Sequence, residues 1–341
     1  NPNGVPAANA NIQFLNLGTN KNLINVNTTP TVNSILFDSA VSYTIEGNAI
    51  TIGAGGITNR SFLNNTINSD LILNANQTWH ANNGSLTFGG LGLNLNSHTL
   101  NLAGAQNFSF ANAISGAGGL TKSGSGILSL NGESTYAGPT TISAGTLSVN
   151  NTAGSATGSG AVSIGNTARL TGSGIIGGAV TLQGGSTILP GVGVGQLTTG
   201  NQIWNGGSVM KLEINQANGV EGTSLGWDKL YVNGSLTLSP LASYTIDLTS
   251  VGALADFDNS QTYSWRFVET TGGITGFSES SFNVQLGNFA NDTGLGDFNI
   301  FSDGNSLYLN FTPVPEPSTI ALGVLGGAMV FGSMLRRRMK K

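Results

Sequence analysis

The sequence predicts an all-β protein whose main part is a right-handed parallel β-helix. Short segments alternate apolar and polar residues, and this period-two pattern places every second side chain on one face of a strand. Glycine accounts for 51 of 341 residues, about twice the usual ~7%, as expected for many tight turns. No window of a dozen residues has a helical period before residue 320. These observations predict many short strands joined by glycine-rich corners.

Residues 1–33 are predicted to form an extended N-terminal or capping segment. The segment is rich in asparagine and contains one strand-like stretch, Ile12–Leu15. It either covers the end of the β-helix, which predicts monomers, or adds to a neighbouring molecule, which predicts polymers. Because the chain starts at Asn1 without a methionine or an apolar leader, we expect that a signal peptide has been removed.

Residues 34–200 are predicted to form the β-helix itself. Many short strands also suit an antiparallel sandwich or barrel, but a quasi-repeat favours a solenoid, in which each turn is completed by its neighbours. Stacked asparagine side chains would bond from turn to turn. The segments that carry the alternation include 42–45, 49–52, 70–73, 85–88, 99–102, 127–130, 146–149 and 179–182.

One stretch within this region, residues 116–149, has a recognisable pattern. It contains Gly-Gly-Leu-Thr-Lys at 118–122, Tyr-Ala-Gly-Pro-Thr-Thr-Ile at 136–142 and Gly-Thr-Leu at 145–147. These elements resemble the autotransporter-associated β-strand repeat, also called the passenger-associated transport repeat. Ile127 stands where that family usually has threonine, which is acceptable on a strand. The resemblance implies a parallel β-helix passenger, although this chain ends in a helix signal instead of a translocating barrel.

Residues 201–312 are predicted to form a C-terminal β-rich cap or sandwich, with longer strands and more aromatic residues. Whether this part is a separate domain stays open. Trp204, Trp227 and Trp265 lie here. Exposed aromatic side chains bind sugars by stacking, but core packing is the simpler explanation for each candidate. The candidates are Trp79, Trp204, Trp227, Trp265, Tyr43 and Tyr136. The predicted strands are 209–214, 229–232, 235–238, 244–248, 263–268, 282–286, 298–301 and 306–311.

The residues that usually carry enzyme chemistry are sparse. The chain has no cysteine, and its two histidines, His80 and His98, are not spaced as metal ligands. No serine motif is accompanied by a plausible histidine and acid. Asp256 and Asp258 form the closest acidic pair, with Asp292, Asp297 and Asp303 further along; turns explain them more simply than calcium. We therefore predict no enzyme, no catalytic or metal residues and no cofactor.

The charge distribution also argues against a nucleic-acid partner. Charged residues make up 8% of the chain, against roughly 25% in an ordinary soluble domain. Five of the twelve basic residues lie beyond Leu335, which leaves seven against sixteen acidic residues before it, a net charge of −9. A body without a basic patch is a poor match for the phosphate backbone of DNA or RNA.

Residues 313–341 have three parts in a fixed order. The block Val314, Pro315, Glu316, Pro317, Ser318 and Thr319 should stay extended, because proline disfavours helix in the residue before it. The uncharged run 320–335 can cross lipid as a single helix. The cations Arg336, Arg337, Arg338, Lys340 and Lys341 would hold the end of the chain on the cytoplasmic side.

This order resembles the PEP-CTERM tail of surface and matrix proteins from Gram-negative bacteria. The resemblance implies that an exosortase-type membrane protease cleaves near the Pro-Glu-Pro motif and passes the protein to the cell surface or extracellular matrix. A permanent anchor is the alternative. The run of sixteen residues is short of the ~17–25 usual for a spanning helix, which favours processing.

The sequence as a whole predicts a non-enzymatic surface or matrix protein with a structural or adhesive role. Its expected partners are the exosortase-type protease, the membrane before processing, further copies of itself and extracellular polysaccharide. The alternative is an extracellular carbohydrate-binding or polysaccharide-degrading β-helix protein. That alternative predicts clustered acidic and aromatic residues on one face of the solenoid.

Overall fold

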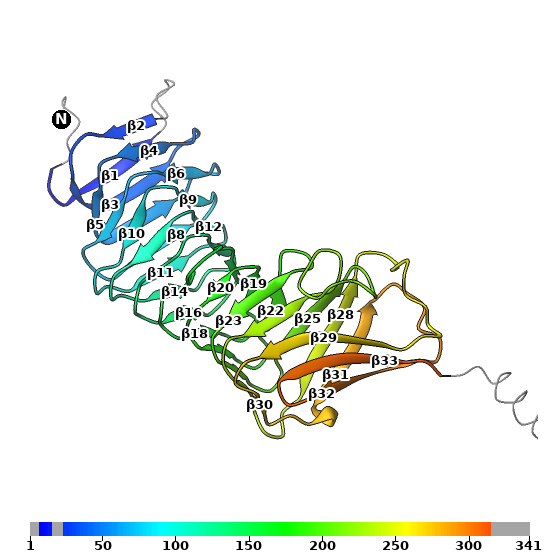
Figure 1. The fold of residues 1–341 in the computed structure, drawn as a ribbon. Coiled ribbons are helices and arrows are strands. Elements are labelled where there is room, and N and C mark those ends of the chain that lie inside the picture. The colour runs from blue at the N-terminus through cyan, green and yellow to red at the C-terminus, as the bar shows by residue number, and fades with distance from the viewer. Residues whose placement is uncertain (1–6, 16–22, 315–341) are drawn as a thin grey trace, which may run out of the picture.

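The computed structural model describes residues 7–15 and 23–314, which form an elongated parallel β-solenoid (Figure 1). Strands from successive turns lie side by side, and nearly every pairing is parallel. Among the described residues the single helical element is a one-turn 3-10 helix, η1 (Glu279–Ser281). The parallel pairing confirms the predicted solenoid and excludes an antiparallel barrel for this region.

Three hydrogen-bonded sheets cover the sides of the solenoid. Sheet A contains β1 (Ala10–Leu15), β3 (Thr31–Asp38), β5 (Ile50–Asn59), β7 (Leu71–Leu73), β8 (Gln77–Ala81), β10 (Gly92–Asn94), β11 (Leu100–Ala103), β13 (Ala113–Ser115), β14 (Leu120–Lys122), β16 (Thr140–Ile142), β18 (Val162–Ile164), β21 (Val180–Leu182), β24 (Gln202–Trp204), β27 (Leu236–Leu238) and β30 (Ile274–Thr275).

Sheet B contains β2 (Leu23–Val26), β4 (Thr44–Gly47), β6 (Asn65–Ile67), β9 (Leu86–Phe88), β12 (Phe108–Phe110), β15 (Ile127–Leu130), β17 (Thr146–Val149), β19 (Arg169–Gly172), β22 (Thr187–Pro190), β25 (Val209–Ile214), β28 (Tyr244–Ser250) and β31 (Phe282–Asn288). Sheet C contains β20 (Ile175–Ile176), β23 (Gln196–Thr199), β26 (Lys229–Val232), β29 (Tyr263–Thr270), β32 (Asp297–Ser302) and β33 (Ser306–Thr312).

The length of a turn changes along the chain. Leu100 pairs with Leu120, so one turn there takes 20 residues. Gln202 pairs with Leu236, so a later turn takes 34 residues. The last two strands of sheet C, β32 and β33, pair antiparallel with each other, and β33 pairs antiparallel with β29. The three sheets continue across residue 200, and the domain boundaries expected from the sequence stay predictions.

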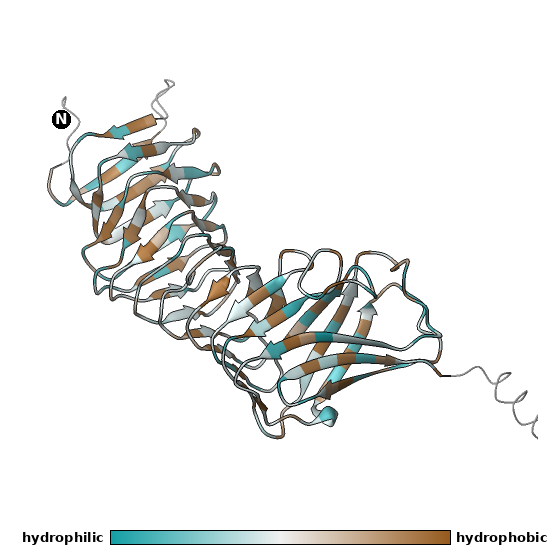
Figure 2. Ribbon diagram, in the orientation of Figure 1, coloured by the Kyte–Doolittle hydropathy of each residue, from teal (hydrophilic) through white to brown (hydrophobic). Residues whose placement is uncertain are grey.

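The core runs through the solenoid as columns of inward side chains. Along the β-strands, hydropathy alternates from residue to residue (Figure 2), in agreement with the buried–exposed alternation of the strands. One column passes through paired strands of sheet A and reads Trp79, Leu102, Lys122, Ile142, Ile164, Leu182 and Trp204. All seven side chains are buried. Six are apolar, and Lys122 is the exception.

Polar side chains at the corners connect neighbouring turns, as the asparagine content predicts. The Asn150 side-chain amide donates to Oδ1 of Asn131 in the preceding turn at 3.2 Å. The Asn112 amide donates to the backbone oxygen of Gly90 at 2.6 Å. These bonds satisfy corner groups that the sheet ladders leave without partners.

Candidate functional site

The sequence-predicted sorting motif lies almost entirely outside the described residues. Val314 is described and half exposed, two residues after the end of β33. Pro315, Glu316, Pro317, Ser318 and Thr319, the apolar run 320–335, and Arg336, Arg337, Arg338, Lys340 and Lys341 fall outside the described part. Within residues 7–15 and 23–314, no helix is both long and apolar enough to span a membrane.

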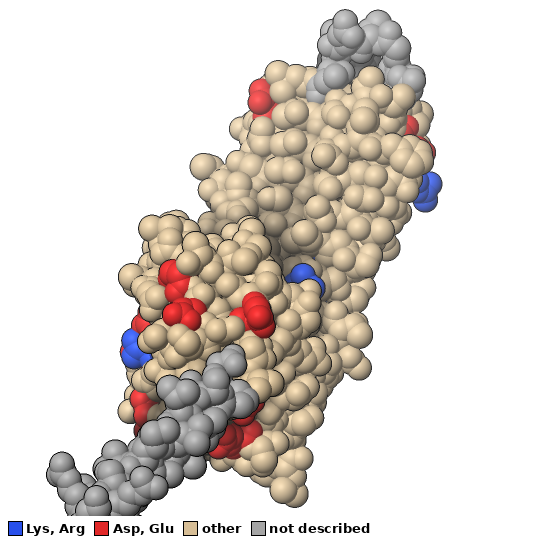
Figure 3. Space-filling view, turned by 90° about the vertical axis from the view of Figure 1, so that its right-hand side faces the viewer, with Lys and Arg blue, Asp and Glu red and all other residues tan. Residues whose placement is uncertain are grey.

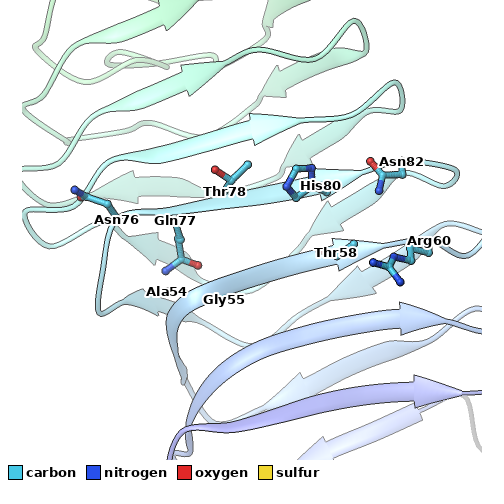
Figure 4. Close-up of a pocket in the computed structure, with 9 residues that line it drawn as sticks. All are labelled: Ala54, Gly55, Thr58, Arg60, Asn76, Gln77, Thr78, His80 and Asn82. Carbon is cyan, nitrogen blue, oxygen red and sulfur yellow. The ribbon is translucent and has the colours of Figure 1, made fainter.

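A polar groove of about 550 Å³ opens on the outer surface between β5 and β8 (Figure 4). Strand β5 crosses from one side of the solenoid to the next: Ile50–Ile52 pair with β7, whereas Thr58 and Asn59 pair with β8. The segment between these two pairings joins neither strand. The groove lies along this break in the ladder. Its lining residues are Ala54, Gly55, Thr58, Arg60, Asn76, Gln77, Thr78, His80 and Asn82.

Strand alternation directs a row of polar side chains toward this groove. Asn76, Thr78, His80 and Asn82 stand at every second position along β8 and its flanks, so all four face outward. Thr58 pairs with His80 across the two strands. Arg60 follows Thr58 by two residues and lies on the same side (Figure 4). The groove therefore combines one guanidinium, one imidazole, amides and hydroxyls.

Hydrogen bonds fix part of the groove. The Gln77 side-chain amide donates to the backbone oxygen of Ile52 at 3.1 Å and accepts from the Trp79 indole at 2.6 Å. Asn76 accepts from the backbone N–H of Thr99 through Oδ1 at 2.9 Å. In the described part of the chain, Arg60 has no ion-pair partner.

The tryptophans and tyrosines considered as sugar-stacking candidates are mostly part of the core. Trp79, Trp204, Trp265, Tyr43 and Tyr136 are buried. Trp227 is partly buried, and its indole N–H donates to the backbone oxygen of Arg266 at 2.9 Å. The core interpretation is thus confirmed for the buried five.

The acidic residues considered for calcium bind backbone N–H groups in turns. Asp256 accepts from Ala217 and Asn218 at 2.9 and 2.7 Å, and Asp258 accepts from Ser260 at 2.9 Å. Asp292 and Asp303 do the same within their own loops. Over the described residues, no three carboxylate or histidine side chains gather as a metal site would require.

Lys122 and Asp228 are among the buried ionisable groups whose pKa values are shifted. Lys122 is fully buried, and burial lowers its pKa to about 8, while its ammonium donates to the backbone oxygen of Gly124. Burial raises the pKa of Asp228 to about 8, against the opposing effect of two N–H groups, from Glu213 and Gly195, each at 2.9 Å. Both groups are enclosed by protein, so we assign them to the architecture and not to chemistry on a ligand.

Most acidic residues of the described chain lie after residue 200, and several form an ion-pair cluster. Lys229 contacts Glu221 at 2.7 Å and also Glu269, and Arg266 contacts both glutamates. The space-filling view shows charged atoms concentrated in the C-terminal part, with a largely uncharged surface over much of the solenoid (Figure 3). Among the residues that line the groove, Arg60 is the one with a permanent charge.

Comparison with known proteins supports the repeat. Residues 120–149 match the model of the Passenger-associated-transport-repeat family, and these residues form β14, β15, β16 and β17 of the solenoid. The chain is 38% identical over 121 residues to "Adhesin BmaC autotransporter" of Brucella suis biovar 1 (strain 1330), across 33% of this chain and 4% of the adhesin.

A second relative is an enzyme by name. The chain is 30% identical over 198 residues to "Extracellular serine protease" of Serratia marcescens, across 55% of this chain and 18% of the protease. The chain thus spans less than a fifth of either relative. The matches show passenger-like β-helix repeats, shared with an adhesin and with a protease.

The sequence did not identify the groove. The spacing of His80 and His98 predicts no metal site, and Arg60 lies outside every motif in the sequence. A local signal does exist, because Asn76, Thr78, His80 and Asn82 alternate with buried residues. That pattern predicts an outward polar row. The approach of Arg60, from a strand one turn earlier, follows only from the pairing of Thr58 with His80.

Proposed function

We propose that this protein is a non-enzymatic, exported structural or adhesive protein of the bacterial cell surface or extracellular matrix. The observation that carries the proposal is the passenger-type repeat at residues 120–149, set in register within a continuous parallel solenoid. The similarity to a named adhesin supports the adhesive role. A Gram-negative bacterium as the source agrees with both the repeat and the tail.

We further propose that an exosortase-type protease processes the C-terminal segment after transient anchoring in the membrane. The support is the order of the Pro-Glu-Pro block, apolar run and basic stub in the sequence. Residues 34–200 would then form the rod, 201–312 its β-rich end, and 313–341 the removed signal. Residues 1–33 would cap the rod or donate a strand to another copy.

The non-enzymatic part of the proposal rests on the sequence, in which no serine motif is accompanied by a plausible histidine and acid. The stretch shared with the serine protease covers 18% of that protein, and we propose that it reflects the β-helix scaffold.

Surface exposure can be tested with a single cysteine, because the native chain has none. Val192→Cys places a thiol at a position that is 77% exposed. We expect a membrane-impermeant maleimide to label this variant on intact cells of the native host. Labelling that requires lysis would overturn export. Leu147→Cys, at a fully buried position, is the matched control for folded protein.

Tail processing needs a separate measurement. The intact mass of protein recovered outside the cells should lack roughly the last two dozen residues. A full-length mass would refute cleavage and leave the permanently anchored alternative. Glu316→Ala with Pro317→Ala should retain the tail and keep the protein cell-associated if the motif is read by a protease.

A carbohydrate-binding role is the second candidate, and the polar groove favours it. The groove has no carboxylate among its lining residues, so binding fits it better than glycosidic bond cleavage, which needs paired acids.

A further inference from the structure

We propose that the groove between β5 and β8 is a binding site for an acidic saccharide, a carbohydrate bearing carboxylate or sulfate groups. The inference rests on the proposed extracellular location, and it names a ligand class for the protein. It is carried by Arg60, by the outward row along β8 and by the break in the β5 ladder.

The shape of the site follows from the path of β5. Ile52 is the last residue of β5 to pair with β7, and Thr58 is the first to pair with β8, so residues 53–57 pair with neither strand. On the other edge of β5, Gly56 and Ile57 still pair with β3. Ala54 and Gly55 are exposed along this stretch. The result is an open channel along the strand direction, which suits an extended chain better than a compact ligand.

The lining chemistry favours a polyhydroxylated ligand. Eight of the nine lining residues present a polar side chain or backbone, and Ala54 is the one aliphatic contribution. Without an aromatic or aliphatic wall, the site offers little apolar area to a peptide or lipid side chain. Amides and hydroxyls both donate and accept, as the hydroxyl groups of a sugar require.

The charge of the groove favours an anionic group on that ligand. Arg60 is exposed, and its guanidinium has no ion-pair partner among the described residues, including Asp38 at the end of the neighbouring strand β3. A planar guanidinium binds carboxylate and sulfate oxygens in pairs. The exposed amide of Asn76 and the ring of His80 line the same channel.

A single cation also limits the charge density of the ligand. The body of the chain carries a net charge of −9 before Leu335, so a polyphosphate would be repelled over most of the surface. A saccharide with one anionic group every sugar or two places one charge near Arg60 and neutral hydroxyls elsewhere. This argument favours an acidic polysaccharide over a nucleic acid.

Calorimetric titration of the purified full chain with defined hexasaccharides tests the proposal. The probes are a hexamer of galacturonate, a sulfated hexasaccharide and a neutral maltohexaose. Arg60→Gln should weaken binding of an acidic probe about tenfold or more, the loss expected for a hydrogen bond to a charged group. Arg169→Gln is the matched control, because Arg169 is an exposed cation on the opposite sheet B, outside the groove.

The result expected is tighter binding of one or both acidic probes than of maltohexaose, with a loss in Arg60→Gln and no more than a twofold change in Arg169→Gln. The carboxylated and sulfated probes distinguish the two sources of negative charge. Ala54→Phe should also weaken binding by filling the channel. Equal losses in both arginine variants, or no binding of either acidic probe, would overturn the site. Because the assay uses purified protein, its failure leaves surface export untouched.

Discussion

The turns before residue 200 and those after it differ in length, in charge and in the contacts that stabilise them. In residues 23–200, turns take about as many residues as the Leu100–Leu120 repeat, and seven side chains are charged. In residues 201–314, one turn takes 38 residues, from Leu236 to Ile274, and fourteen side chains are charged. In the earlier part, few residues connect one strand to the next. In the later part, long loops connect the strands, and further contacts must keep those loops in place.

Glycine corners hold the short turns. At Gly118 an added methyl group would overlap the backbone oxygen of His98 in the preceding turn, and at Gly124 it would overlap that of Gly104. Such a close approach of backbones is possible only without a Cβ atom. Asparagine side chains supply the hydrogen bonds between these corners. Stability in this part depends on uniform stacking.

Aromatic packing and ion pairs hold the long turns. Tyr263 stacks on Trp265 with ring centroids 5.2 Å apart, and Phe298 packs on Phe311 at 4.9 Å. Glu221, from the loop between β25 and β26, joins Arg266 and Lys229 through charged hydrogen bonds. The comparison shows that the turns of a solenoid can be longer where aromatic packing and ion pairs take the place of closely stacked glycine corners.

Removing a large aromatic side chain should affect the long turns most. Trp265 is 1% exposed, and its indole N–H donates to the backbone oxygen of Ala217 at 2.8 Å. We expect Trp265→Ala to lower the free energy of unfolding by about 4 kcal/mol. Urea unfolding followed by hydrogen exchange should show the loss of protection concentrated after residue 200. An equal loss of protection in residues 65–200 would show that the two parts are one cooperative unit.

The second-largest loss of stability should come from adding a methyl group at a glycine corner of the short turns. We expect Gly118→Ala to cost about 3 kcal/mol, because the new atom meets backbone that cannot move without opening the turn. Gly287→Ala on β31 is the control, since no atom lies within 4 Å of the added methyl group. Urea midpoints for the two variants measure the difference. If both midpoints shift equally, close backbone contact is not what distinguishes the short turns.

Replacing Lys122, in the short turns, should stabilise the protein. Its pKa is about 8 when folded, against 10.5 ordinarily, so the unfolded chain binds more protons between these values. Stability of the native protein should therefore rise as the pH increases from 8 to 10.5. Lys122→Met should be more stable at pH 7, by about 2 kcal/mol once the lost bond to Gly124 is allowed for.

The measurement for Lys122 is the difference in unfolding free energy between the two proteins at several pH values. The advantage of Lys122→Met should shrink above pH 8 and disappear above 10.5. If the difference in unfolding free energy does not change with pH, Lys122 does not carry a charge while it is buried. Lys211→Met, at an ion-paired and partly exposed position, is the control for replacing a lysine with methionine outside the core.

The smallest effect is expected in the ion-pair cluster. Glu221 is desolvated by burial, but hydrogen bonds from Arg266 and Lys229 outweigh burial and lower its pKa. Glu221→Gln should cost about 1 kcal/mol at neutral pH. Because the native pKa lies below the ordinary 4.5, this contribution should be lost as the pH falls below 4.5. Glu46→Gln in the short turns, which makes no ion pair among the described residues, should change little.

Local patterns predicted individual strands well. The strands expected at 209–214 and 229–232 agree with β25 and β26 residue for residue. Strand β8 was not predicted, although Trp79 and its neighbours alternate. Its sequence, Gln-Thr-Trp-His-Ala, has a polar residue at an inward position, where Gln77 is buried because it bonds to Ile52 and Trp79. The Ile52 oxygen comes from the preceding turn, so burial of Gln77 depends on a contact between turns.

The sequence by itself determined the class of fold, because strand alternation and glycine corners act over a few residues. It also predicted the repeat at residues 116–149, of which residues 120–149 match the family model. The tertiary structure alone decided which side chains meet between turns. Arg60 reaches the row on β8 because β5 changes its pairing partner between Ile52 and Thr58. Lys122 is inside because strand parity and its stacked neighbours, Leu102 and Ile142, override the preference of an ammonium for water.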